Sequence, residues 1–282
     1  MNKFYRFTGT AVAAVTLAAA AAAFSAPYAA AQATTNHAAA APVAAPFPHP
    51  MIPARGEAAP TAIGTSTTLQ SQNWAGYAVG RSGVKFKKIK ATFFVPFLNC
   101  AVSPSTFSSH WVGFDGVTSD TVEQDGIEAD CNGSTPHYFA WREVFPRPEQ
   151  PFSMHIHAGD SITASVKFSK SSGKYRMEVR DNTRGTHDTA RQRCTGSSCK
   201  RSSAEVISEA PTVGGSQSSL ADYGAVSYAG ISIKGAGHTG GIKSSHWSRI
   251  KIEQVGIDSH DVIAIPTALQ GRSFDVYWLG EN

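Results

Sequence analysis

Two short stretches of the chain place amide and carboxylate side chains where an extended backbone would present them on one face. Val122–Gly126 reads VEQDG, and Ser203–Pro211 reads SAEVISEAP. Because side chains alternate between the two faces of a strand, Glu205 and Glu209 share a face. A carboxylate can take a proton from water, and an amide such as that of Gln124 both donates and accepts hydrogen bonds. The two stretches together predict acid–base chemistry on a bound water.

The stretch from Ser108 to Pro146 surrounds Gln124 with tryptophans and acidic residues. Trp111–Gly116 reads WVGFDG, and Tyr138–Pro146 reads YFAWREVFP. In the second of these, strand alternation places four side chains on one face, namely Phe139, Trp141, Glu143 and Phe145. This composition predicts a cleft with a polar floor and apolar walls, which suits the binding of a polymer.

The N-terminal quarter of the 282-residue chain does not have the composition of a folded domain. Lys3 and Arg6 precede an apolar, Ala-rich run, and small residues at Ala29–Ala31 complete the pattern of a secretory signal peptide over residues 1–31. Residues 32–66 are rich in Ala and Pro and bury too little apolar surface to fold. We expect a removable pro-segment or a plain linker there, and favour the first. Residues 67–282 are long enough for one folded domain.

Strand patterns recur after residue 66, whereas no apolar stripe with a 3.6-residue period has a useful length. Ile162–Phe168 alternates apolar and polar residues, and a Ser-Ser-Gly turn leads from it into Tyr175–Val179, which predicts a hairpin. Further strands are expected over Val84–Val95, Ala225–Ile233, Ile250–Val255 and Ser273–Trp278. Many short strands separated by Gly, Ser and Asn favour an antiparallel β-sandwich.

The chain has four cysteines, and an even number in an exported chain predicts disulfide bonds. Cys100, Cys131, Cys194 and Cys199 allow three connectivities. The short loop between Cys194 and Cys199 favours their pairing, which leaves Cys100 with Cys131.

The formal net charge of +4 reflects basic clusters at Lys85–Lys90 and Arg191–Arg201. We interpret these clusters as solvated strand faces and a charged loop rather than as a nucleic-acid surface. His155 and His157 would share a strand face, but no third metal ligand is close to them in the sequence. We interpret that segment as a surface strand rather than as a metal site.

An ordered set of motifs resembles the glutamic peptidases, or eqolisins, a family of secreted acid endopeptidases. The set begins with SQNWAGY at Ser71–Tyr77, continues through WVGFDG, VEQDG, YFAWREVFP and SAEVISEAP, and ends with LADYGAVSY at Leu220–Tyr228. The resemblance implies an all-β, lectin-like (concanavalin A-like) sandwich of two antiparallel sheets. It also implies a secreted monomer that acts on polypeptide substrates without a cofactor, a metal, a nucleic acid or a membrane.

By position, the catalytic glutamine of the family falls on Gln124 and its catalytic glutamate on Glu209. Glu205 matches another glutamate of the same strand that is not the catalytic one. The substrate-binding residues of the family fall on Trp74, Trp111, Asp115, Trp141, Glu143 and Phe145. Phe139 stands where the family often has an aspartate, which leaves Asp125 or Asp115 to place a carboxylate near Gln124.

The resemblance implies a metal-independent endopeptidase in which Glu209 activates water and Gln124 stabilises the oxyanion. One alternative is a glycoside hydrolase or lyase that uses Glu143 and Glu209, with tryptophans as sugar platforms. The other is a secreted lectin-like module without catalysis. Neither alternative predicts the ordered occurrence of VEQDG and SAEVISEAP.

Overall fold

A computed structural model describes residues 66–194 and 199–281 of the chain. The expected signal peptide and all but the last residue of the expected pro-segment therefore lie outside the described residues. All regular secondary structure in the described part is β-strand. No helix in that part is long and apolar enough to cross a membrane.

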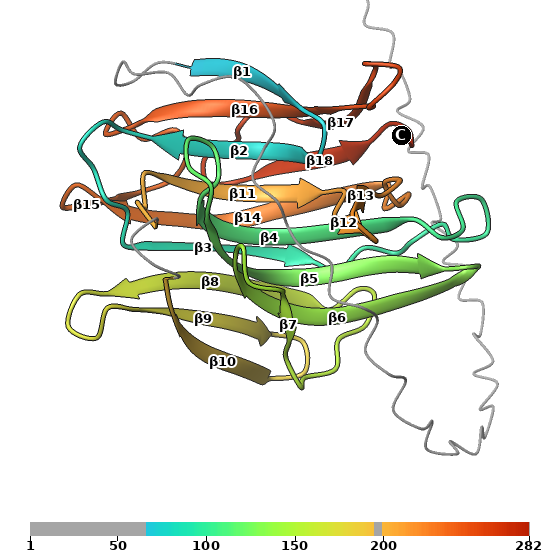
Figure 1. Ribbon diagram of the computed structural model, residues 1–282, viewed down its shortest axis with the longest axis horizontal. Coiled ribbons are helices and arrows are strands. Elements are labelled where there is room, and N and C mark those ends of the chain that lie inside the picture. Colours follow the sequence, from blue (N-terminus) through green and yellow to red (C-terminus); the bar gives the residue numbers. More distant parts are fainter. Residues whose placement is uncertain (1–65, 195–198, 282) are drawn as a thin grey trace, which may run out of the picture. The chain divides into compact units, whose positions relative to one another are not determined.

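One layer of the molecule contains all the strands that carry the predicted chemistry. Its hydrogen-bonded order is β18, β17, β16, β2, β11, β4, β5, β6 and β7, with β1 added in parallel to β16 (Figure 1). The bounds are β1 Ser66–Ser71, β2 Trp74–Gly80, β4 Phe107–Asp115, β5 Val122–Asn132, β6 Thr135–Val144, β7 Gln150–Pro151, β11 Ser203–Glu209, β16 Ser248–Val255, β17 Val262–Pro266 and β18 Phe274–Trp278.

The second layer has the order β10, β9, β8, β3 and β14. Its bounds are β3 Lys88–Phe94, β8 Ser161–Ser169, β9 Lys174–Asp181, β10 Thr186–Arg193 and β14 Ala225–Gly235. Three short strands lie beside this framework, namely β12 Thr212–Val213, β13 Ser216–Gln217 and β15 His238–Gly240.

The long strand β14 belongs to both layers. Its first residues, 225–228, pair with β18, and Ala229 and residues 232–234 pair with β3, with a shift in register between Ala229 and Ser232. Gly230, at the shift, has a φ of 60°, a conformation that a glycine adopts without steric cost. The two layers are therefore one continuous path of antiparallel strands that bends at β14.

The hydrophobic core fills the space between the layers. Every second residue of the facing strands points into it, as in Val112 and Phe114 of β4, Ile162 and Val166 of β8, and Met177 of β9. The predicted all-β sandwich is thus confirmed, as are the predicted hairpin of β8 with β9 and the strands β3, β14, β16 and β18.

The structure also confirms both disulfides and corrects one local prediction. Cys100 is bonded to Cys131, and Cys194 to Cys199. The surface strand predicted around His155 and His157 is wrong, because this segment has no strand pairing and ends in a turn at residues 158–159.

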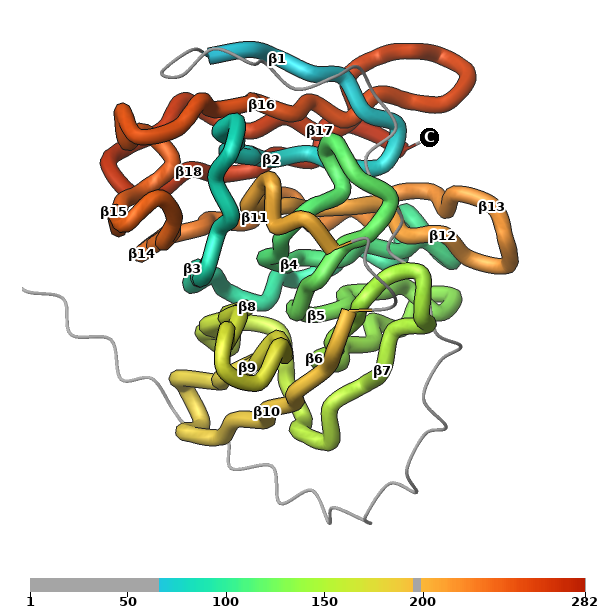
Figure 2. The backbone as a smooth tube through the Cα atoms, turned by 60° about the vertical axis from the view of Figure 1, so that its left-hand side comes forward, coloured from blue at the N-terminus to red at the C-terminus, as the bar shows by residue number. Residues whose placement is uncertain are grey.

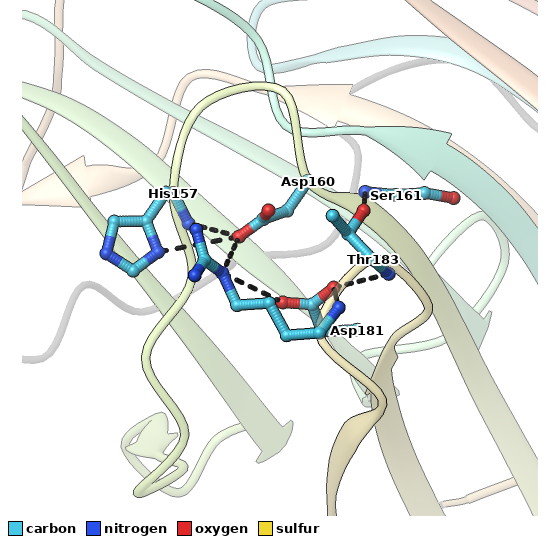
Figure 3. A network of polar contacts seen from close by, with 6 residues as sticks. His157, Asp160, Ser161, Asp181 and Thr183 are labelled. Atoms are coloured by element: carbon cyan, nitrogen blue, oxygen red, sulfur yellow. Dashed lines mark hydrogen bonds and ion pairs between the residues drawn. The ribbon is translucent and has the colours of Figure 1, made fainter. Parts of the chain in front are cut away.

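The turn after His157 is fixed by a buried carboxylate, which Figure 3 shows at close range. Asp160 accepts hydrogen bonds from the backbone N–H of His157 and from Nε of Arg184, both at 2.8 Å. Arg184 also lies 3.6 Å from Asp181, whose carboxylate accepts the N–H groups of Thr183 and Arg184. The network ties the loop before β8 to the turn between β9 and β10.

Replacing Asp160 by Asn should destabilise the fold more at pH 6 than at pH 2. Burial alone would raise the pKa of Asp160, but the hydrogen bonds and charges of Arg184 and His157 lower it overall. A carboxyl with a lowered pKa stabilises the fold above its unfolded pKa, and that contribution is lost as the pH falls through its folded pKa. We expect a loss of about 2 kcal/mol at pH 6, measured by urea unfolding, and little loss at pH 2.

His157→Ala provides the control. The side chain of His157 is 59 % exposed and its Nδ1 lies 3.5 Å from Oδ2 of Asp160, whereas its backbone N–H, which the variant keeps, donates to Oδ2 at 2.8 Å. An equal loss of stability for both variants, or an Asp160→Asn effect that does not depend on pH, would contradict the role assigned to the carboxylate.

Candidate active site

Strand β4 is the centre of the candidate site because it pairs with β11 on one side and β5 on the other. Gly113 of β4 lies opposite Glu205 of β11 and also opposite Gln124 of β5. Gln124 in turn lies opposite Glu143 of β6. Figure 2 shows the four strands following one another across the sheet. Residues that lie opposite one another on neighbouring strands form a row across the sheet. The first row brings Glu205, Gln124 and Glu143 onto the face that points away from the core.

The next row on the same face is aromatic. Ile207, Trp111, Gly126 and Trp141 lie opposite one another on β11, β4, β5 and β6. Gly126 is required here, because a Cβ atom on it would lie 2.3 Å from the backbone oxygen of His110 and 2.6 Å from Cβ of Trp111. The missing side chain lets the indole rings of Trp111 and Trp141 occupy this row.

A second acidic row follows beyond the tryptophans. Glu209, Ser109, Glu128 and Phe139 lie opposite one another, and Trp74 of β2 lies opposite Glu209. The rings of Trp74 and Trp111 meet edge to face with centroids 4.9 Å apart. The face therefore alternates acidic and aromatic rows.

The Glu209 carboxylate is held from both sides by N–H donors. Nε1 of Trp111 donates to its Oε2 at 2.9 Å, and Nδ2 of Asn73 donates to its Oε1 at 3.1 Å. Burial raises the pKa of Glu209 well above its usual value, while the hydrogen bonds from Asn73, Trp111 and Trp74 oppose that rise. These donors orient a carboxylate and favour its ionised form.

The amide of Gln124 is oriented by Glu143, whose Oε2 accepts a hydrogen bond from Nε2 of Gln124 at 2.7 Å. The carboxylate next to Gln124 is thus Glu143, not Asp125 or Asp115 as considered from the sequence. Asp125 points to the opposite face, where its Oδ2 accepts the backbone N–H of Glu178 at 2.5 Å. Phe139 takes part in the other acidic row, beside Glu128.

Glu205 has a different environment from Glu209. Burial raises its pKa well above the usual value, a hydrogen bond with Ser203 opposes the rise, and the charges of Asp115 and Glu123 add to it. Glu209 accepts hydrogen bonds from two side-chain N–H donors, whereas no N–H donor to Glu205 is found among the described residues. This environment favours the protonated form of Glu205.

The structure gathers most of the predicted site residues on one face. Gln124, Glu143, Glu209 and the tryptophans 74, 111 and 141 lie there, and all are fully buried. The backbone register aligns Gln124 with Glu205, so Glu209 lies in the second acidic row, on the far side of Trp111. Phe145 packs at the edge of the same aromatic cluster.

Two residues have positions that the sequence prediction did not anticipate. Asp115, predicted to bind substrate, ends β4 and accepts the backbone N–H groups of Arg201 and Ser202 at 2.6 and 2.8 Å, which ties down the segment before β11. Asn73 was not singled out, although it precedes Trp74 in the SQNWAGY motif. Its contact with Glu209 joins residues that are 136 positions apart, so only the fold reveals it.

Comparisons with known proteins agree with this fold. A family model described as the Peptidase A4 family matches residues 72–267. Scytalido-glutamic peptidase with a transition state analog inhibitor is similar to the chain with a TM-score of 0.64 and 23 % identity, over 74 % of this chain and 98 % of that one. A search of curated proteins gives no match.

Two further solved structures of the same kind are similar. SCP-B, a member of the eqolisin family in a complex with the tripeptide Ala-Ile-His, has a TM-score of 0.60 and 23 % identity, over 74 % of this chain and 98 % of that one. Aspergilloglutamic peptidase from Aspergillus niger has a TM-score of 0.52 and 23 % identity, over 62 % of this chain and 99 % of that one. At this identity the likeness establishes the shared fold.

Replacing Glu205 by Gln should flatten the dependence of stability on pH. A carboxyl with a raised pKa contributes stability below its unfolded pKa and loses it as the pH rises through the folded pKa. Each such group lowers the stability by about 1.4 kcal/mol per pH unit across that interval, and a glutamine does not titrate. We expect the fall in Tm between pH 4 and pH 7 to be smaller in the variant. An unchanged or steeper fall would refute the buried, protonated state of Glu205.

Proposed function

The chain belongs to the Peptidase A4 family of glutamic peptidases, and on this premise we propose that it is a secreted, acid-active endopeptidase that hydrolyses peptide bonds with Gln124 and Glu209. The observation that carries the proposal is the Glu209 carboxylate, held by Asn73 and Trp111 on the same sheet face as the oriented amide of Gln124. The face between them carries the tryptophan row.

Glu209 serves as the general base. As a carboxylate it takes a proton from a water molecule, and the resulting hydroxide attacks the carbonyl carbon of the scissile peptide bond. The same carboxyl then passes the proton to the amine nitrogen as the C–N bond breaks. Glu205 is less suited to this step, because no N–H donor among the described residues holds its carboxyl, whereas Asn73 and Trp111 hold that of Glu209.

Gln124 serves as the donor to the oxyanion. Its amide nitrogen carries two N–H groups, of which one is directed to Glu143, and the other is assigned to the oxygen of the tetrahedral intermediate. Gln124 and Glu209 lie on opposite sides of β4, level with Gly113 and Ser109, about 16 Å apart at the usual strand dimensions. The proposal therefore requires that substrate binding bring the two side chains together over Trp111. Because a glutamine does not titrate, this donor is retained at acid pH.

The proposed location follows from the same features. The disulfides Cys100–Cys131 and Cys194–Cys199 are typical of proteins in an oxidising compartment such as the cell exterior. The signal pattern of residues 1–31 predicts export. Because Gln124 and Glu209 are fully buried in the chain described, a substrate can reach them only after this face opens, which fits an inactive precursor.

Glu209→Gln should abolish hydrolysis of a denatured protein at acid pH, because a glutamine cannot accept the proton of water. Gln124→Ala should lower kcat by about two to three decades, the usual cost of one lost oxyanion donor. Glu205→Gln, on the same strand, is the matched control and should retain most of the activity. The measurement is the release of peptides by the processed protein with a chelator present.

Three results would contradict this assignment. Activity that survives in Glu209→Gln but not in Glu205→Gln would make Glu205 the base. Activity lost on chelation would require a metal. Cleavage of polysaccharide without proteolysis would support the alternative carbohydrate-active enzyme.

The acid limb of kcat/KM should follow the ionisation of Glu209 and move in opposite directions in two variants. Asn73→Ala removes a donor to the carboxylate, which raises the pKa of Glu209 and moves the limb to higher pH. Glu149→Gln removes a nearby charge that raises the same pKa, so the limb should move to lower pH. We expect shifts of up to about one pH unit in pH–rate profiles. Identical profiles for both variants would show that another group controls the limb.

A further inference from the structure

Five basic residues form one straight row across the outer face of the second layer. Lys234 of β14 lies opposite Lys88 of β3, which lies opposite Lys167 of β8. Lys167 lies opposite Arg176 of β9, and Arg176 opposite Arg191 of β10. The five strands are adjacent in Figure 1, so the row is about 19 Å long at the usual strand spacing of about 4.8 Å. We refer to these five residues as the cationic row.

The cationic row is accessible and electrostatically unfavourable by itself. Lys167, Arg191 and Lys234 are exposed, and Lys88 and Arg176 are half-buried. Like charges directly opposite each other destabilise a sheet. Burial lowers the pKa of Lys88, and the charges of Lys90, Lys167 and Arg176 lower it further, while the charge of Glu178 opposes them. Glu178 pairs with Arg176 and offsets part of this repulsion. An anionic ligand would neutralise the remaining positive charge of the row.

The surroundings of the row fit a sugar polymer. A surface hollow of about 220 Å³ lies over it, lined by Lys167, Arg176 and Arg191 of the row together with Ser169, Ser172 and Lys174. In the neighbouring row, Ser165 of β8 and Thr189 of β10 lie on either side of Glu178, which pairs with Arg176 and Arg180. Hydroxyl groups donate and accept hydrogen bonds, as the hydroxyls of a sugar require.

The row itself lacks what a nucleic acid would use. Single-stranded nucleic acids are held by aromatic platforms interleaved with basic residues, and the five members of the row are all Lys or Arg. The two disulfides also point to an oxidising compartment outside the cytosol, where acidic polysaccharides are common polymers.

We propose that the cationic row is a docking surface for a linear acidic polysaccharide, which binds through its carboxylate or sulfate groups. The surface lies on the second layer, whereas the candidate active site lies on the first, so a docked chain leaves that site unobstructed. Docking would hold the protein on an acidic matrix while its other face acts. The proposal does not depend on the identity of the catalytic residues.

The test is binding of the full chain to polygalacturonate at pH 5 and low salt, by isothermal titration calorimetry, with heparin as a sulfated probe and dextran as a neutral one. We expect binding to both anionic polymers, loss of binding at 0.5 M salt and no binding to dextran. The variant Lys167→Glu/Arg191→Glu should bind at least about tenfold more weakly. The variant Lys243→Glu/Arg272→Glu changes the net charge equally at exposed residues outside the row and should bind as the unchanged chain does.

Activity on a small soluble protein should be the same in both double variants, which shows that they are folded and separates this proposal from the catalytic one. Four results would overturn it. These are no binding to either anionic polymer, equal weakening by the two double variants, binding to dextran as tight as to polygalacturonate, and tighter binding of a single-stranded DNA oligonucleotide than of both polysaccharides.

Discussion

The candidate site depends on the register in which β4 pairs with β11 on one side and β5 on the other. Those ladders place Gly113 between Glu205 and Gln124, and Trp111 between Ile207 and Gly126. A slip of one residue in either ladder would turn the affected strand's acidic and aromatic side chains toward the core. The core on the other face prevents that slip, because Val112, Phe114 and Val206 fill it only in this register.

The same face holds several carboxyl groups away from water, and this determines which pH suits the protein. Burial raises the pKa of Glu205, Glu209 and Glu128, so each costs free energy to ionise in the folded state. Only Glu209 of these three is held by side-chain N–H donors from Asn73 and Trp111. These three carboxyls therefore contribute stability at acid pH, and the N–H donors from Asn73 and Trp111 oppose the rise in pKa at Glu209.

The two layers have outer faces of opposite character. The first layer gathers acids and tryptophans, while the second presents the cationic row and a fringe of hydroxyl groups. The separation follows from strand alternation, because each layer buries one face in the shared core and leaves the other for function. The net charge of +4 does not reveal this separation of acidic and basic residues, because they are separated between the two faces and not between segments of the sequence.

The sequence alone determined the all-β class and which side chains share a face within a strand, because alternation is a local property of an extended backbone. It also favoured the disulfide pairing that the structure confirms. It also provided the motifs of the family, and with them the prediction of Gln124 and Glu209 as the catalytic pair. Only the tertiary structure decided which residues meet: Asn73 with Glu209, Glu143 rather than Asp125 with Gln124, and Lys88 with Lys167 and Arg176 in one row. These contacts depend on strand order and register, which are set by packing between segments far apart in the chain, and no local pattern records them.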